Sequence, residues 1–204
     1  MINESDCHWF PMRIRNSSLP RLNLMLERFE KQKEKLQEEN ILLEAYAPLR
    51  YIKVNANKMD FAPYLLNYIF VHSTYGNLLR IKSNQEWFEP LRFVMHPAYD
   101  ERLRRYSEVV VIPDKTMEDY RRIADSEKEN VLFLKDMQYA IKPSQLVQII
   151  EGPFTGVIGR VKRVQGKRCV VLTVGDRQAA AIVDVHKNHL RYLTEAEAWR
   201  LGNQ

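Results

Sequence analysis

Glycine is scarce in this chain, and its placement indicates which kind of structure the second half of the sequence forms. Only 7 of the 204 residues are glycine, and three of them, Gly152, Gly156 and Gly159, lie in the stretch EGPFTGVIGRV. A phosphate-binding loop needs a Lys-Ser/Thr pair after its last glycine, but Val157 follows Gly156 and Arg160 follows Gly159. A G-x-G-x-x-G dinucleotide fingerprint is absent as well. The glycines are therefore interpreted as tight turns between the strands of a small all-β module.

Cysteine and long apolar runs are also scarce, and this scarcity limits the cellular compartments in which the protein is expected. The two cysteines, Cys7 and Cys169, lie far apart without metal-like spacing, which favours reduced thiols. No run approaches the roughly 20 apolar residues that cross a bilayer. The first residues, MINESDCHWFPMRIRN, include early acids and no apolar segment, so they do not resemble a secretory signal. We expect a cytoplasmic protein without a membrane partner.

The sequence lacks the residue patterns of a catalytic site. It has no G-x-S-x-G nucleophile motif. His186 and His189 are spaced as two metal ligands on one helical face, but no third ligand is near them in the sequence, which favours surface histidines. No nucleophile, base and orienting group come together. The sequence therefore predicts a binding protein with no enzymatic activity, no metal and no cofactor.

Positive charge is concentrated in the glycine-rich part of the chain. The formal net charge is +5, to which residues 1–140 contribute zero, residues 141–193 contribute +6 and residues 194–204 contribute −1. After Gly159 the sequence RVKRVQGKRCVVLTV combines basic residues with a strand pattern, and Gln165-Gly166-Lys167 is typical of a hairpin turn. The basic module suggests an anionic or acidic partner, although solubility alone also explains such a charge.

The order of predicted elements indicates an α+β protein. The first 140 residues show a strand at HWFPMRI, a helix capped by Ser18, a strand in AYAPLRYIKV, a strand around Tyr68, a short helix starting at Ser83, a further strand, and a helix after Pro113. This order predicts an antiparallel sheet flanked by helices, followed by a five-stranded SH3-like β-barrel. The predicted domains are residues 1–130, a linker at 131–140, the barrel at 141–193 and a short terminal helix at 194–204, where Thr194 and Glu197 form a capping box.

Aromatic residues on the first and third predicted strands are the strongest binding signal. Side chains alternate between the two faces of a strand. If the two strands are neighbours, Trp9 or Phe10 forms a patch with Tyr68 on one face. Such a patch is either a docking surface for another molecule or part of the core beneath the helices, and the sequence leaves both interpretations open.

Several motifs together resemble the NusG family of transcription elongation factors. The stretch IEGPFTGVIGRVKRVQGKRCVVLTV resembles the KOW motif with its G-P-F-x-G-x-x-G core. Upstream, HWFPMRI, NYIFV and VVIPDKTMEDYRRI are similar to the matching family segments in the same order. The sequence LLNY stands at residues 65–68 where the family has F-P-G-Y. Such departures are similar to the specialised antiterminators of polysaccharide-biosynthesis operons.

The resemblance implies a function, partners and site residues. In the family, the N-terminal domain binds the clamp helices of RNA polymerase through an apolar surface, which here corresponds to Trp9, Phe10, Tyr68 and Phe70. The KOW domain recruits a ribosomal protein or the termination factor Rho, which implies contacts at Phe154, Thr155 and Ile158. Contacts with non-template DNA beside the first strand are implied for Arg13, Arg15 and Asn16, and the protein is expected to be a monomer. The alternative is an RNA-binding or ribosome-associated KOW protein, which the basic module favours.

Overall fold

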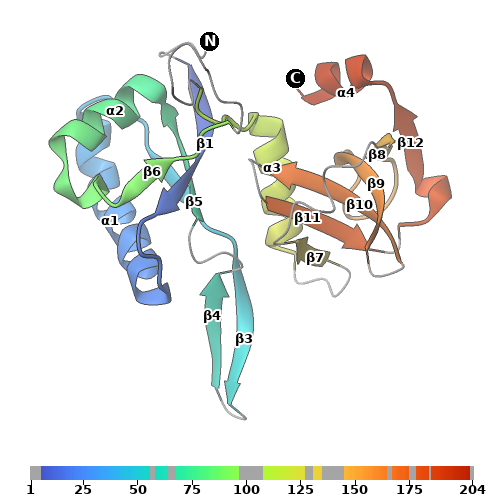
Figure 1. Cartoon of the computed structure of the whole chain (residues 1–204), viewed down its shortest axis with the longest axis horizontal. Helices are drawn as coiled ribbons and strands as arrows, with labels where there is room; N and C mark the ends of the chain where they lie inside the picture. Colours follow the sequence, from blue (N-terminus) through green and yellow to red (C-terminus); the bar gives the residue numbers. More distant parts are fainter. Residues whose placement is uncertain are drawn as a thin grey trace. The chain divides into compact units, whose positions relative to one another are not determined.

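The computed structural model describes residues 6–55, 58–63, 68–96, 108–126, 131–134, 145–164, 167–174, 178–183 and 185–202 (Figure 1). It is a mixed α/β structure whose strand pairs in these ranges are all antiparallel. Contacts within the chain divide it into two compact units, Met1–Ile112 and Pro113–Gln204. We call these unit 1 and unit 2 and describe each by itself.

The described residues of unit 1 form two sheets and two α-helices. The four-stranded sheet has the order β2-β5-β1-β6, and β3 and β4 form a separate hairpin. The elements are β1 (Cys7–Ile14), α1 (Leu19–Glu38), β2 (Glu44–Tyr46), β3 (Leu49–Asn55), β4 (Lys58–Pro63), β5 (Tyr68–Thr74), α2 (Tyr75–Asn84), the 3-10 turn Glu86–Phe88 and β6 (Leu91–Phe93).

One face of the four-stranded sheet packs against both helices and forms the core of unit 1. Phe10 and Met12 of β1 and Ile69 and Val71 of β5 are fully buried in this cluster. They meet side chains of α1 and α2 that recur at helical spacing, namely Leu22, Met25, Phe29, Leu36, Leu78 and Ile81. The helices therefore cover one face of the sheet and leave the second face for other contacts.

Helix α1 begins where the sequence predicts. The hydroxyl of Ser18 accepts a hydrogen bond from the Arg21 amide at 3.4 Å, and Pro20 lies in the first turn, where a missing N–H is harmless. Asn16, in the turn before the helix, has φ of 52°, a left-handed conformation that asparagine tolerates. This turn directs the chain from β1 back onto the sheet.

The second helix lies earlier than the sequence analysis places it. The prediction of a helix that starts at Ser83 is wrong. Helix α2 ends at Asn84, and a 3-10 turn at Glu86–Phe88 follows it. Thr74 caps α2 by accepting a hydrogen bond from the Asn77 amide at 3.1 Å. The Ser83 hydroxyl instead donates to the Leu79 carbonyl at 3.0 Å, inside the last turn of α2.

The predicted single strand AYAPLRYIKV is two strands that belong to different sheets. The strand β2 pairs with β5, whereas β3 pairs with β4. The break falls at Ala47 and Pro48. Proline has no N–H to donate to a strand ladder, which explains why pairing stops there.

Unit 2 is built around a six-stranded antiparallel sheet with the order β12-β8-β9-β10-β11-β7. Its elements are α3 (Asp114–Ala124), β7 (Val131–Leu134), β8 (Leu146–Ile149), β9 (Ile158–Val164), β10 (Lys167–Val174), β11 (Gln178–Val183), the 3-10 turn Lys187–His189, β12 (Leu190–Leu193) and α4 (Glu195–Gly202). Strands β12, β8, β9, β10 and β11 are five neighbours, as the barrel prediction requires, and β7 adds a sixth. No pairing between the described residues closes this sheet, so the barrel stays a prediction.

The division into units differs from the predicted boundary near residue 130. Helix α3 buries Met117, Tyr120 and Ile123, and unit 2 includes it. Residues 131–134, which the sequence assigns to a linker, form β7 and pair with β11. The apolar sequence VLFL explains this pairing, because such residues favour a strand. The rest of the predicted linker lies outside the described residues.

The terminal helix α4 contains the predicted capping box. The Thr194 hydroxyl accepts a hydrogen bond from the Glu197 amide at 3.2 Å, and the Glu197 carboxylate accepts one from the Thr194 amide at 2.8 Å. The pKa of Glu197 is lowered, first by this backbone hydrogen bond and then by the Thr194 hydroxyl. The capping contribution is therefore complete above the ordinary glutamate pKa of 4.5 and is lost as the pH falls through the lower pKa of the folded state.

We expect Thr194→Ala to weaken α4 by about 1 kcal/mol, because it removes the side-chain acceptor at the helix start. The Ala198 amide, which donates to the Thr194 carbonyl at 3.0 Å, reports this change through faster hydrogen exchange. The protection of the same amide in the wild-type chain, measured relative to the intrinsic exchange rate at each pH, should fall below about pH 4.5. Glu195→Gln is the control, because Glu195 pairs with Arg160 and takes no part in the cap. Equal effects of the two substitutions would contradict the role of the capping box.

None of the helices in the described ranges has the length and apolar character that a membrane span requires.

Candidate functional site

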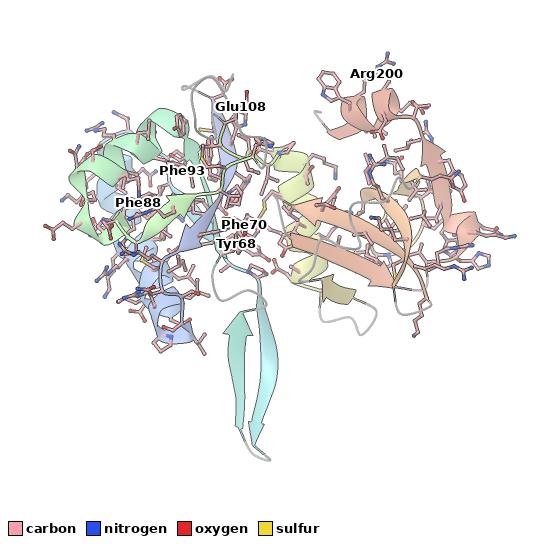
Figure 2. All side chains as sticks on the ribbon, in the orientation of Figure 1. Tyr68, Phe70, Phe88, Phe93, Glu108 and Arg200 are labelled. Atoms are coloured by element: carbon pink, nitrogen blue, oxygen red, sulfur yellow. The ribbon has the colours of Figure 1, made fainter. Side chains whose placement is uncertain are left out.

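The second face of the unit 1 sheet carries most of the aromatic residues singled out in the sequence. Strands β1 and β5 pair with Trp9 opposite His72, Pro11 opposite Phe70 and Arg13 opposite Tyr68. Because paired residues share a face, these six residues lie together. We call them the aromatic face. Figure 2 shows Tyr68 and Phe70 on the side of the sheet away from Phe88, which belongs to the helix-covered core.

Phe10 does not join the aromatic face. It alternates with Trp9 along β1 and lies in the helix-covered core, 6.1 Å from Tyr75 and 6.0 Å from Phe93 between ring centroids. The structure therefore resolves which of the two neighbouring residues accompanies Tyr68. Trp9 does, and Phe10 supports the fold.

Polar groups position the rings of the aromatic face. The Arg13 Nε donates to the Tyr68 hydroxyl at 3.0 Å, and the Arg13 guanidinium carbon lies 5.5 Å from the centre of the Tyr68 ring. The Trp9 and His72 rings are 5.0 Å apart. Arg13, which the resemblance assigns to DNA contact, is thus held by Tyr68.

The aromatic face is buried. Trp9, Tyr68 and Phe70 are exposed by only 5%, 4% and 0%. Tyr68 packs with Val94 and Val110, and a bridge from Ile112 to Trp9 runs along the edge of β1. The rings of the aromatic face are therefore nearly closed to solvent in this structure.

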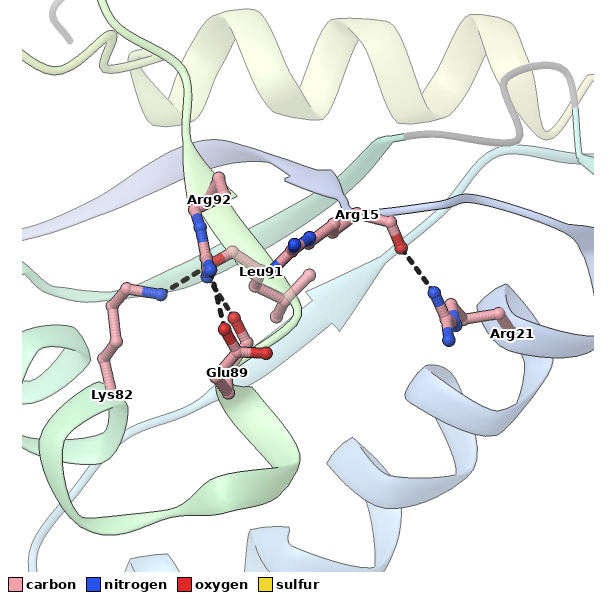
Figure 3. A network of polar contacts seen from close by, with 6 residues as sticks. All are labelled: Arg15, Arg21, Lys82, Glu89, Leu91 and Arg92. Carbon is pink, nitrogen blue, oxygen red and sulfur yellow. Dashed lines mark hydrogen bonds and ion pairs between the residues drawn. The ribbon is translucent and has the colours of Figure 1, made fainter.

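A basic corner lies where β1, α1, α2 and β6 meet (Figure 3). It consists of the bases Arg15, Arg21, Lys82 and Arg92 and the acid Glu89. Arg21 donates to the backbone carbonyls of Arg15 and Asn16, at 2.8 and 3.2 Å. These bonds hold the turn that contains two of the three residues assigned to DNA contact.

Charge in the basic corner is only partly balanced. The Arg92 guanidinium contacts the Glu89 carboxylate at 2.7 Å, and this hydrogen bond is the main reason that the pKa of Glu89 is lowered. The pKa of Lys82 is lowered by burial and then by the nearby Arg92 charge, while its Nζ donates to the Leu91 carbonyl at 2.6 Å. Positive charge is therefore in excess among the five residues of this corner.

In unit 2, the glycine-rich stretch forms a compact turn between β8 and β9. Gly152 and Gly156 have φ of 90° and 91°, which side chains rarely adopt. The Gly156 amide donates to the Ile149 carbonyl at 2.7 Å, and the Thr155 hydroxyl donates to the Gly152 carbonyl at 2.6 Å. Of the residues assigned to partner binding, Phe154 is buried, Ile158 is half-buried and Thr155 is exposed.

Helix α3 is tied to this turn by a polar contact. The Arg122 guanidinium donates to the Thr155 carbonyl at 2.9 Å and to the buried Asp119 carboxylate at 3.3 Å. The same Asp119 oxygen accepts from Lys115 at 2.7 Å. The spacing of Lys115, Asp119 and Arg122 predicts contacts along the helix but not the contact with the turn.

The two histidines with metal-like spacing lie close together in unit 2. Their ring centroids are 5.6 Å apart, and the Nε2 of His189 lies 3.1 Å from the Glu151 carboxylate. No group of three His, Cys, Asp or Glu side chains in the described ranges is arranged to hold a metal ion.

The sequence does not predict a functional role for three members of the basic corner, namely Arg21, Lys82 and Arg92. They come from α1, α2 and β6, and no local motif connects them. Only the pairing of β6 with β1 places Arg92 near Arg15. The sequence predicts a helix that starts only at Ser83, so it does not place Lys82 on a helix beside the basic corner.

No protein-family model and no curated protein matches this chain. A solved structure described as "Domain interaction in Thermotoga maritima NusG" is similar with a TM-score of 0.46 and 18% sequence identity, over 94% of this chain and 100% of that chain.

Proposed function

We propose that this chain is a non-enzymatic transcription elongation or antitermination factor, which binds RNA polymerase through the aromatic face of unit 1. The observation that supports this proposal most directly is the second apolar face of the four-stranded sheet. Helices cover only the face that contains Phe10, whereas Trp9, Tyr68 and Phe70 stand on the other. Large aromatic residues grouped in this way are typical of binding hot spots.

The motifs that resemble the NusG family support the same conclusion and name the partner as the clamp helices of RNA polymerase. The basic corner, with Arg15 and Asn16 at its turn, is proposed to face non-template DNA. The turn of unit 2, with Phe154, Thr155 and Ile158, is proposed to recruit a ribosomal protein or Rho. The protein acts in this proposal as a cytoplasmic monomer and as a specialised member of the family, of the kind found with polysaccharide-biosynthesis operons.

We expect Tyr68→Ala to weaken binding to RNA polymerase by about 2 kcal/mol, or roughly thirtyfold, because it removes a central ring of the aromatic face. Trp9→Ala should have a similar effect. Tyr68→Phe keeps the ring and loses only the hydroxyl that accepts from Arg13. It should retain most of the affinity in a titration of labelled protein with purified polymerase.

Tyr192→Ala is the matched control, because Tyr192 is an exposed tyrosine of unit 2. A folded Tyr68→Ala variant that binds polymerase like the wild type would place the docking surface elsewhere. Co-purification from lysate separates the proposal from its alternative. Polymerase subunits support a transcription factor, and ribosomal RNA supports a ribosome-associated KOW protein.

A further inference from the structure

Helix α3 packs directly against the strands of unit 2. It contacts β10 and β11, and the side chains of Met117, Tyr120 and Ile123 are fully buried. The glycine-rich turn at residues 152–157 belongs to the same compact unit. A helix that precedes the strands of the module in the sequence is therefore in a position to support the turn.

One side chain of α3 makes this contact. The Arg122 Nη2 donates to the Thr155 carbonyl oxygen at 2.9 Å, and the same nitrogen donates to the Asp119 carboxylate at 3.3 Å. Asp119 is only 3% exposed, and its carboxylate also accepts from Lys115 at 2.7 Å. The guanidinium group that reaches the turn is thus held in place by a buried acid.

The buried acid is better explained by orientation than by stability. Removing a carboxylate from water carries a large free-energy cost, and replacing a buried ion pair with apolar residues is often neutral or stabilising. An apolar residue would therefore serve a helix that only has to pack. Asp119 instead pairs with Arg122 three positions further along the helix, and this pairing fixes the direction in which the guanidinium group points.

The turn benefits from such support because of its glycines. Gly152 and Gly156 have φ of 90° and 91°, and glycine has the widest choice of backbone conformations. Several bonds of the turn are local, since the amide and the hydroxyl of Thr155 both donate to the Gly152 carbonyl, at 3.1 and 2.6 Å. The bond from Arg122 connects the turn to a second element of the unit and restricts the conformations that it can adopt.

We propose that Arg122 is a positioning residue for the partner that this turn recruits, and that α3 is part of the recruiting site. The inference rests on the proposed function of Phe154, Thr155 and Ile158. Thr155 is exposed while its carbonyl is held by Arg122. A partner that contacts Thr155 therefore meets a backbone that is already fixed, and less conformational entropy is lost on binding.

The test measures binding of the full-length chain to purified ribosomes and to purified Rho. Arg122→Gln should weaken binding to the probe that the wild type binds by about tenfold, as expected when a hydrogen bond from a charged group is lost. Arg122→Lys should restore most of the affinity, because an ammonium group has three donors. Lys115→Gln is the matched control, since it removes the other base from Asp119 and leaves the contact with the turn intact. It should leave the affinity unchanged.

Three results would overturn the proposal. They are equal losses of affinity in Arg122→Gln and Lys115→Gln, no loss in Arg122→Gln, and tighter binding of Arg122→Gln, which would mean that α3 covers the partner surface. The two variants should melt at similar temperatures, because each removes one base from the same acid, so stability does not explain a difference in affinity. If Arg122→Gln does not fold, Arg122→Met takes its place, since it keeps the aliphatic part of the side chain.

Failure of the recruiting function gives a different result. If the wild type binds neither ribosomes nor Rho, the proposed recruitment is wrong, and the conformation of the turn decides the role of Arg122. The Gly156 amide donates to the Ile149 carbonyl at 2.7 Å and reports on the turn through hydrogen exchange. Its exchange should be about tenfold faster in Arg122→Gln and unchanged in Lys115→Gln. Unchanged exchange in both variants would show that Arg122 does not hold the turn.

Discussion

Replacing Phe10 with alanine is expected to lower the free energy of unfolding of unit 1 by about 4 kcal/mol, the usual range for a buried phenylalanine being 3–5. Phe10 is fully buried, and its ring contacts Tyr75 and Phe93 beneath the helices. The substitution removes most of the side chain and leaves a cavity that α1 and α2 cannot fill without moving. Urea unfolding followed by circular dichroism measures the loss.

Leu24→Ala is the matched control, because Leu24 is a large apolar residue on the exposed side of α1. It should change stability by less than about 1 kcal/mol. The result also tests the separation of Phe10 from the aromatic face. A Phe10→Ala variant that remains as stable as the wild type but no longer binds polymerase would show that the two faces have been assigned the wrong way round.

The sequence predicts that Trp9 and Phe10 point to opposite faces, because side chains alternate along a strand. It does not predict which face the helices cover. That depends on α2, whose sequence YGNLLRIKSN follows β5 without a break and contains no proline or acid to mark its start. Ser83 looks like a helix cap in isolation, yet its hydroxyl bonds to the preceding turn of α2. A local capping signal therefore predicts the wrong helix start where a helix directly follows a strand.

Long-range contacts explain the remaining differences between expectation and structure. The apolar segment Val131–Leu134 has the composition of a strand, and its pairing partner β11 lies more than 40 residues further along the chain. The basic corner likewise forms from four elements that the chain brings together through the β1–β6 pairing. In contrast, Ser18 at α1 and Thr194 at α4 are recognised from the sequence, because a cap depends on residues only three positions away.

We expect Gly159→Ala to destabilise unit 2 by about 3 kcal/mol, because there is no space for a side chain at this position of β9. A Cβ atom there would lie 2.8 Å from Val170 Cγ1, 2.8 Å from the Val171 carbonyl oxygen and 3.1 Å from its carbon. A backbone carbonyl cannot turn away as a flexible side chain can, so β10 itself must shift. Because β10 lies in the middle of the six-stranded sheet, the shift disturbs both of its neighbours, β9 and β11. Thermal unfolding of the variant measures the loss.

Gly156 provides the control, because its requirement for glycine has a different origin. Nothing lies within 4 Å of a Cβ at Gly156, but φ is +91°, which disfavours side chains by roughly 1–2 kcal/mol. Asparagine tolerates positive φ better than alanine does, so Gly156→Asn should be the milder substitution at that position. At Gly159 the order should reverse, because the larger asparagine side chain meets the same carbonyl and needs still more space. The same order at both positions would show that one cause, either space or backbone conformation, acts at the two glycines and would contradict the close approach of β9 to β10 as the reason for glycine at 159.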